Sequence, residues 1–116
     1  MYPTNIRRRR ELATPKRQPP VISSVAPPSF PTGGSTVIKG RNFGRFKAGG
    51  KVYFGEAAAY GDCATLVEQP TYLWADTSIG ISNTIQGGLP DNCYAYVVTK
   101  DGRVNSSGAS VSFMPL

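Results

Sequence analysis

The sequence of 116 residues contains no histidine, only two cysteines and only seven acidic residues. Without histidine it lacks the most common general base and the most common nitrogen ligand of metals. Cys63 and Cys93 lie too far apart in the chain for the spacing of a zinc site. The aspartates occupy turn-like contexts, in which Asp usually caps or closes a turn. We therefore predict no catalytic residue, no metal, no cofactor and no enzymatic activity.

Long apolar runs are also missing. No run approaches the roughly 18 residues needed to cross a bilayer. The first residues, Met1 to Ile6 followed by four arginines, lack the apolar region of a secretory signal. We therefore expect a protein that is not exported by a signal peptide and has no membrane partner. In a reducing cytoplasm, Cys63 and Cys93 are expected to be free thiols packed as small apolar groups, although a single disulfide would satisfy the count.

Positive charge is concentrated at the N-terminus. Residues 1–19 carry six basic residues and one acidic residue, a net charge of +5 out of +6 for the whole chain. The basic residues are Arg7, Arg8, Arg9, Arg10, Lys16 and Arg17. Repulsion between like charges, together with frequent prolines, opposes a packed core. We predict that residues 1–19 form an extended basic arm and that residues 20–116 form one folded domain.

From Pro20 onward, short apolar runs recur between Gly, Pro, Asn and Asp residues. No window shows the 3.6-residue apolar period of a helix, and only residues 56–60 suggest a brief helical turn. The expected strands are 21–25, 36–40, 51–55, 63–67, the region 72–81, 92–99 and 109–113. About seven short strands at near-regular spacing predict an all-β, immunoglobulin-like sandwich.

Several short segments, taken in order, resemble the IPT/TIG family of immunoglobulin-like domains. They are PVISSVAP at 20–27, Gly33-Gly34, IKGRNFG at 38–44, VYFG at 52–55, WADTSI at 74–79, and YVV at 96–98 leading to Gly102. The resemblance covers the chain from about Pro20 to Phe113 and implies an immunoglobulin-like fold. Thr36 departs from it, because an apolar residue is expected there.

The strand predicted at 92–99 is apolar on both faces. One face carries Cys93, Ala95 and Val97, and the opposite face carries Tyr94, Tyr96 and Val98. A half-exposed strand normally alternates with polar residues. Two interpretations remain open: a central strand with its small residues outside, or a subunit contact of a homo-oligomer through Cys93, Ala95 and Val97.

The arm suggests the partner. Arginine presents a planar fork that holds carboxylate or phosphate by two hydrogen bonds. Domains similar to IPT/TIG occur on phage virions, on cell-surface receptors and in transcription factors. We expect a structural protein of a bacteriophage virion, assembled in the host cytoplasm, whose arm attaches it to capsid or tail subunits as a decoration or head/tail accessory protein.

Two other hypotheses remain. The chain is alternatively a nucleic-acid-binding protein that uses the arginine-rich arm, with the steep salt dependence of phosphate contacts. As a further alternative, it is a carbohydrate-binding module in host recognition, in which Tyr53, Tyr60 and Tyr72 stack on sugars.

Overall fold

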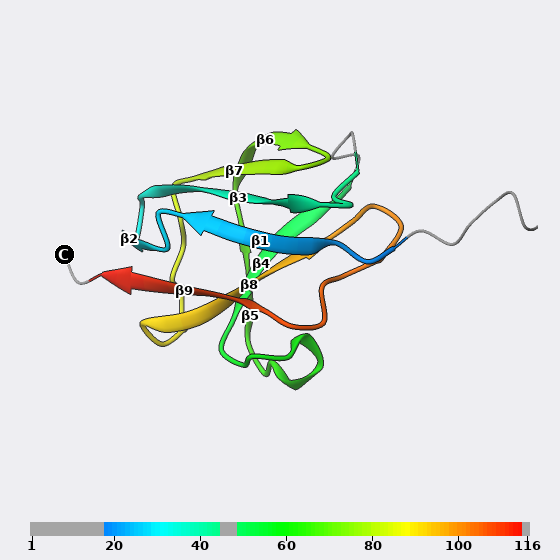
Figure 1. The fold of residues 1–116 in the computed structure, drawn as a ribbon. Helices are drawn as coiled ribbons and strands as arrows, with labels where there is room; N and C mark the ends of the chain where they lie inside the picture. Colours follow the sequence, from blue (N-terminus) through cyan, green and yellow to red (C-terminus); the bar gives the residue numbers. More distant parts are fainter. Residues whose placement is uncertain (1–17, 45–48, 115–116) are drawn as a thin grey trace, which may run out of the picture.

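A computed structural model describes residues 18–44 and 49–114, and these residues form a two-layered β-sandwich (Figure 1). The arm residues from Met1 to Arg17 lie outside the described part. The strands are β1 (Val21–Ala26), β2 (Ser29–Pro31), β3 (Ser35–Arg41), β4 (Lys51–Gly55), β5 (Leu66–Gln69), β6 (Thr71–Ala75), β7 (Ser78–Ser82), β8 (Asn92–Val98) and β9 (Ala109–Met114), with one 3-10 turn, η1 (Tyr60–Asp62). The prediction of an all-β, immunoglobulin-like sandwich is confirmed.

One sheet has the strand order β1-β3-β7-β6, and the other has the order β2-β9-β8-β4-β5. All neighbouring strands are antiparallel except β2 and β9, which are parallel. The chain passes from the first sheet to the second at Pro27-Pro28, because proline has no backbone N–H to continue the ladder. The first and last described residues lie at opposite ends of the sandwich (Figure 1).

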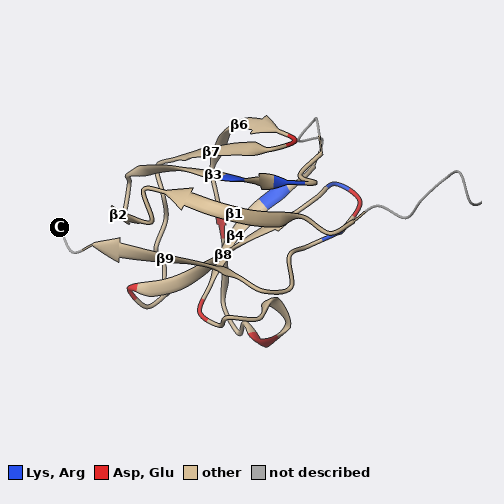
Figure 2. Ribbon diagram, in the orientation of Figure 1, with Lys and Arg blue, Asp and Glu red and all other residues tan. Residues whose placement is uncertain are grey.

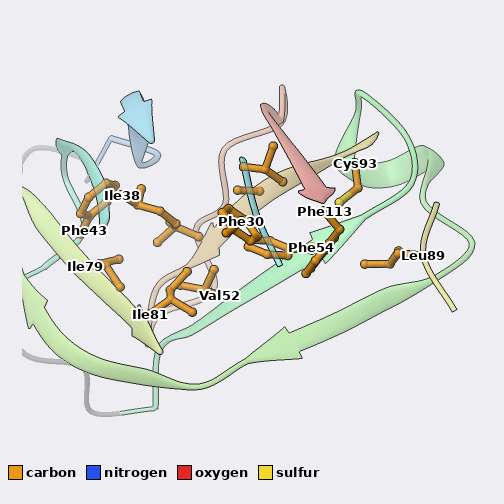
Figure 3. Packing of buried hydrophobic residues seen from close by; sticks show 13 residues of the cluster. Phe30, Ile38, Phe43, Val52, Phe54, Ile79, Ile81, Leu89, Cys93 and Phe113 are labelled. Atoms are coloured by element: carbon orange, nitrogen blue, oxygen red, sulfur yellow. The ribbon is translucent and has the colours of Figure 1, made fainter. Parts of the chain in front are cut away.

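The core lies between the two sheets and consists of residues that alternate along each strand. Three aromatic rings form its centre, with ring centroids 5.2–5.8 Å apart: Phe30, Phe54 and Phe113 (Figure 3). The surrounding buried apolar residues include Ile38, Val52, Ile79, Ile81, Cys93, Ala95, Val97 and Val111. Both cysteines are free thiols, Cys63 half-buried and Cys93 buried.

The end of the sandwich at which residue 18 enters is closed by two aromatic residues. Phe43 is buried there, and the Trp74 indole N–H donates hydrogen bonds to the carbonyls of Phe43 (3.2 Å) and Gly44 (3.1 Å). Gly40 is required beside them, because a Cβ on this residue would stand 1.9 Å from the carbonyl oxygen of Val21.

Thr36, the departure from the IPT/TIG pattern, is 2% exposed in the core. Its hydroxyl donates a hydrogen bond of 2.6 Å to the carbonyl of Pro27. The threonine therefore satisfies a backbone acceptor at the point where the chain changes sheets.

The strand predictions differ from the structure in two places. Strand β2 was not predicted, since Pro28 and Pro31 indicated turns on both sides of it. The fourth predicted strand, 63–67, is displaced by about three residues toward the C-terminus: residues 56–65 instead form a loop that contains η1, and β5 starts at Leu66. Within the described ranges, no helix has the length and apolar character of a membrane span.

Candidate functional site

The charged side chains of the described residues are distributed unevenly over the sandwich. All described lysines and arginines lie toward the end at which residue 18 enters (Figure 2). They are Lys39, Arg41, Lys51, Lys100 and Arg103, and we call this region the cationic end. Three acidic residues lie among them: Glu68 pairs with Lys51 at 3.2 Å, Asp101 pairs with Arg103 at 3.0 Å, and the Asp76 carboxylate accepts from the Gly44 N–H.

Arg103 connects three segments at the cationic end. Its Nε lies 3.0 Å from both carboxylate oxygens of Asp101, and its Nη1 donates to the carbonyl oxygens of Gln18 and of Asn42, the latter at 3.5 Å. The Arg103 side chain is only 17% exposed. Hydrogen bonds from the Thr99 hydroxyl and then from Arg103 lower the pKa of Asp101. The point at which the chain enters the domain is therefore fixed by a charge-assisted network.

A small polar pocket of about 150 Å³ adjoins this network. It is lined by Gln18, Asn42, Gly44, Asp76 and Arg103. The Asp76 carboxylate accepts a hydrogen bond of 2.9 Å from the Gly44 N–H, so this acid closes a loop as its turn context predicted. The pocket carries charges of both signs, and the described residues contain no group of three potential metal ligands. Its geometry therefore supports a structural role.

A larger, open groove of about 390 Å³ runs between residues 19–22 and residues 105–108. No charged side chain lines it. The groove contains one buried side-chain amide, that of Asn105. This amide accepts a hydrogen bond from the Val97 N–H (2.7 Å) and donates one to the Ala95 carbonyl (3.2 Å), so its hydrogen-bonding capacity is used within the domain. The groove therefore offers no reactive group.

The structure places contacts at two residues that the sequence analysis assigned to the arm. The Gln18 carbonyl accepts from Arg103, and the Pro19 carbonyl accepts from the Asn42 side chain at 3.3 Å. Pro20 is fully buried. The predicted partner-binding residues Arg7, Arg8, Arg9, Arg10, Lys16 and Arg17 lie outside the described residues.

The predicted subunit contact through Cys93, Ala95 and Val97 is wrong. These side chains are 1%, 0% and 0% exposed, because they point from β8 into the core between the sheets. Strand β8 lies between β9 and β4, and its small residues make room for the bulky residues that face them. The tyrosines of this strand occupy the outer face.

The outer face of β8 is covered by a loop that the sequence did not reveal. We call residues 56–65 the flap. Tyr96 is 0% exposed beneath the flap. Its hydroxyl donates a hydrogen bond to the Ala57 carbonyl, and the Tyr60 ring packs edge-on against the Tyr96 ring with 5.2 Å between the ring centroids. Burial and a hydrogen bond with Cys63 raise the Tyr96 pKa. Two tyrosines and an alanine-rich loop in the sequence were the only signals for this cover.

The flap is closed by Glu56. Its carboxylate oxygens accept hydrogen bonds from the N–H groups of Ala64 (2.6 Å) and Thr65 (2.9 Å), and these bonds lower the Glu56 pKa. Further backbone hydrogen bonds tie the flap to residues 106–108. The flap is therefore an integral part of the fold and occupies the outer surface of this sheet.

The tyrosines proposed for sugar stacking are not gathered into one platform. Tyr53 lies in β4 and Tyr60 lies in the flap, both on the side of the five-stranded sheet. Tyr72 lies in β6, at the edge of the other sheet, and is 63% exposed. The structure therefore provides no single aromatic surface made of all three.

Comparisons with known proteins agree with the fold. A crystal structure at 1.70 Å of a structural-genomics protein of unknown function from Bacteroides thetaiotaomicron matches with a TM-score of 0.68 at 20% sequence identity. The match covers 86% of this chain but only 23% of that chain, and at this identity it shows the fold alone. A comparison with curated proteins gives no match.

The family model of the IPT/TIG domain matches residues 20–113, which is most of the sequence and the extent of the resemblance predicted above. IPT/TIG domains are typically non-catalytic and generally mediate protein–protein interactions. The chain therefore belongs to the IPT/TIG domain family.

Proposed function

We propose that this chain is an interaction domain attached to a larger assembly through its basic N-terminal arm, and that the assembly is a bacteriophage virion. One observation carries the proposal: the described basic residues gather at the end of the domain at which Gln18 enters (Figure 2). The preceding residues add six more basic side chains in the sequence. The arm and the cationic end together favour an anionic partner surface.

The network around Arg103 supports this arrangement. It joins Gln18 to Asp101 and Asn42, so the residue that follows the arm is hydrogen-bonded, through Arg103, to two loops of the domain. The arginines suit carboxylates on a protein surface, because each can form two hydrogen bonds with one carboxylate. In this proposal the partners are capsid or tail subunits, and assembly takes place in the host cytoplasm.

The experiment compares the full chain with a variant that starts at Gln18. Both are produced in cells that make the virion, and particles are isolated on a density gradient in high salt. We expect the full chain to sediment with particles and the shortened chain to remain free. Absence of the full chain from washed particles would contradict the virion proposal.

Nucleic acid is the second candidate, because no ion pair engages Lys39, Arg41 or Lys100 among the described residues. A 20-base-pair duplex binding assay at increasing salt separates the two. Tight binding with a steep negative slope of log K against log salt, lost with residues 1–17, would favour nucleic acid over the virion surface.

A further inference from the structure

The outer face of the four-stranded sheet carries an apolar patch at its centre. In register across the sheet lie Ala26 of β1, Val37 of β3, Gly80 of β7 and Leu73 of β6. Leu73 is 47% exposed and the neighbouring Tyr72 is 63% exposed. We call these five residues the sheet patch. It differs from the outer face of the other sheet, where the flap covers Tyr96.

Tyr72 has a defined position in the sheet patch. A Cβ on Gly80 would stand only 2.6–2.9 Å from the tip of the Tyr72 ring, so the ring occupies the space that this glycine leaves open. The register of β6 shifts between Thr71 and Leu73, which places Tyr72 in a bulge. An aromatic ring held in place yet exposed has the properties of a binding anchor, since little side-chain entropy is lost on contact.

The strands of this sheet carry positive charge only, and the one acidic residue in the turn between β6 and β7, Asp76, accepts a hydrogen bond from the Gly44 N–H. Lys39 and Arg41 follow Val37 on the same face of β3, since residues two apart in a strand share a face. None of the strands β1, β3, β6 and β7 contains an acidic residue. Neither basic side chain forms an ion pair within the described ranges. The charge therefore favours an acidic partner.

The edges of this sheet do not invite an added strand. Both β6 and β1 have a register shift against their neighbours, and prolines flank β1 at Pro20 and Pro27 and precede β6 at Pro70. Bulges and prolines are devices that block edge-to-edge pairing. A partner is therefore expected on the face of the sheet, where the exposed side chains lie.

We propose that the sheet patch binds an acidic segment of another protein, with an apolar side chain of that segment on Tyr72 and Leu73 and its carboxylates at Lys39 and Arg41. A second copy of this chain fits less well, since Lys39 and Arg41 would meet like charges across a symmetric contact. This binding is separate from attachment through the arm and goes beyond the proposed function.

The test selects peptides from a random dodecapeptide library on the full chain, with counter-selection on Tyr72→Ser. The arm is present in both proteins, so its attraction for acidic peptides cancels. We expect the selected peptides to combine Asp or Glu with Leu or an aromatic residue. Calorimetry on one such synthetic peptide should show binding weakened about tenfold or more by Tyr72→Ser and by Lys39→Glu.

Matched controls are Tyr53→Ser, a tyrosine of the other sheet, and Lys100→Glu, a lysine of a loop at the cationic end. Both should leave the affinity within about twofold of the unaltered chain. Tyr72→Phe, which keeps the ring over Gly80, should retain binding, and an unchanged unfolding midpoint shows that each variant folds. The exposed Lys39→Glu change keeps the test decisive even if Tyr72→Ser unfolds.

Three results would overturn the proposal. The first is a set of selected peptides without an excess of Asp and Glu, or peptides that bind Tyr72→Ser and Lys39→Glu as tightly as they bind the unaltered chain. The second is reversible dimerisation of the chain in sedimentation velocity that Tyr72→Ser abolishes, which would assign the patch to a second copy. The third is a twelve-nucleotide oligothymidine that binds in a Tyr72-dependent manner and displaces the peptide.

Discussion

Two threonines on either side of Ile81 offer a sharp test of the core. Thr36 and Thr71 are both paired with Ile81 in the register of the four-stranded sheet. The Thr36 hydroxyl donates to the Pro27 carbonyl at 2.6 Å, whereas the buried Thr71 hydroxyl has no hydrogen-bond partner among residues 18–44 and 49–114. Substitution by valine keeps the shape and the β-branched backbone preference at both positions, so the hydroxyl is the main difference.

The expected changes have opposite signs. Thr71→Val removes an unsatisfied buried hydroxyl, whose burial costs about 1–3 kcal/mol, and should raise the free energy of unfolding by about 1 kcal/mol. Thr36→Val deletes a hydrogen bond with a net worth of about 0.5–1.5 kcal/mol and leaves the Pro27 carbonyl facing a methyl group, so it should lower stability. One kcal/mol corresponds to about 4–8 °C in the unfolding midpoint of a domain of this size.

Urea unfolding of both variants and of the double variant measures these values. The double variant shows whether the two changes are coupled through Ile81, the residue that both threonines face in the sheet. Equal losses of stability in both single variants would refute the reasoning, since they would show that the valine shape, and not the hydroxyl, decides the outcome.

Three further predictions follow from local geometry. Gly40→Ala should destabilise the domain by several kcal/mol because its Cβ would collide with the backbone, while Gly61→Ala, with nothing within 4 Å, should be nearly neutral in the same thermal melt. A thiol reagent at pH 8 should modify the half-buried Cys63 first and Cys93 only on unfolding, since burial and then Asp91 raise the Cys93 pKa to about 11; two equally fast thiols would disagree. Because the pKa of Asp101 is lowered in the folded state, its stabilising contribution is present above its unfolded pKa of about 4 and is lost as the pH falls through the folded value. Asp101→Asn should therefore reduce the pH dependence of the free energy of unfolding, measured in urea, across that pH range.

The sequence predicted those features that depend on local pattern. Alternating apolar residues and turn-forming Gly, Pro, Asn and Asp residues indicated most strands. The passage of the chain from β1 in one sheet to β2 in the other could not be predicted, because β2 is three residues long and lies among prolines that indicate turns.

The faces of β8 show why the site was harder to predict. Alternation separates Cys93, Ala95 and Val97 from the tyrosines, but it does not say which set faces the core. The flap decides this: it buries Tyr96 from outside, which leaves the small residues for the interior. The tyrosines and the alanine-rich loop do not reveal that residues far apart in the chain form this cover, and no local signal indicates the placement of Tyr72 over Gly80.

The central proposal is that the folded domain begins at Gln18 and that residues 1–17 serve attachment. Thermal unfolding of three chains tests it most directly: the full chain, a chain that starts at Gln18 and a chain that starts at Val21. We predict the same midpoint for the first two and a midpoint several degrees lower for the third, which loses the hydrogen bonds at Gln18 and Pro19 and the buried Pro20. A lower midpoint for the chain that starts at Gln18 would contradict the claim, because residues 1–17 would then be part of the folded domain.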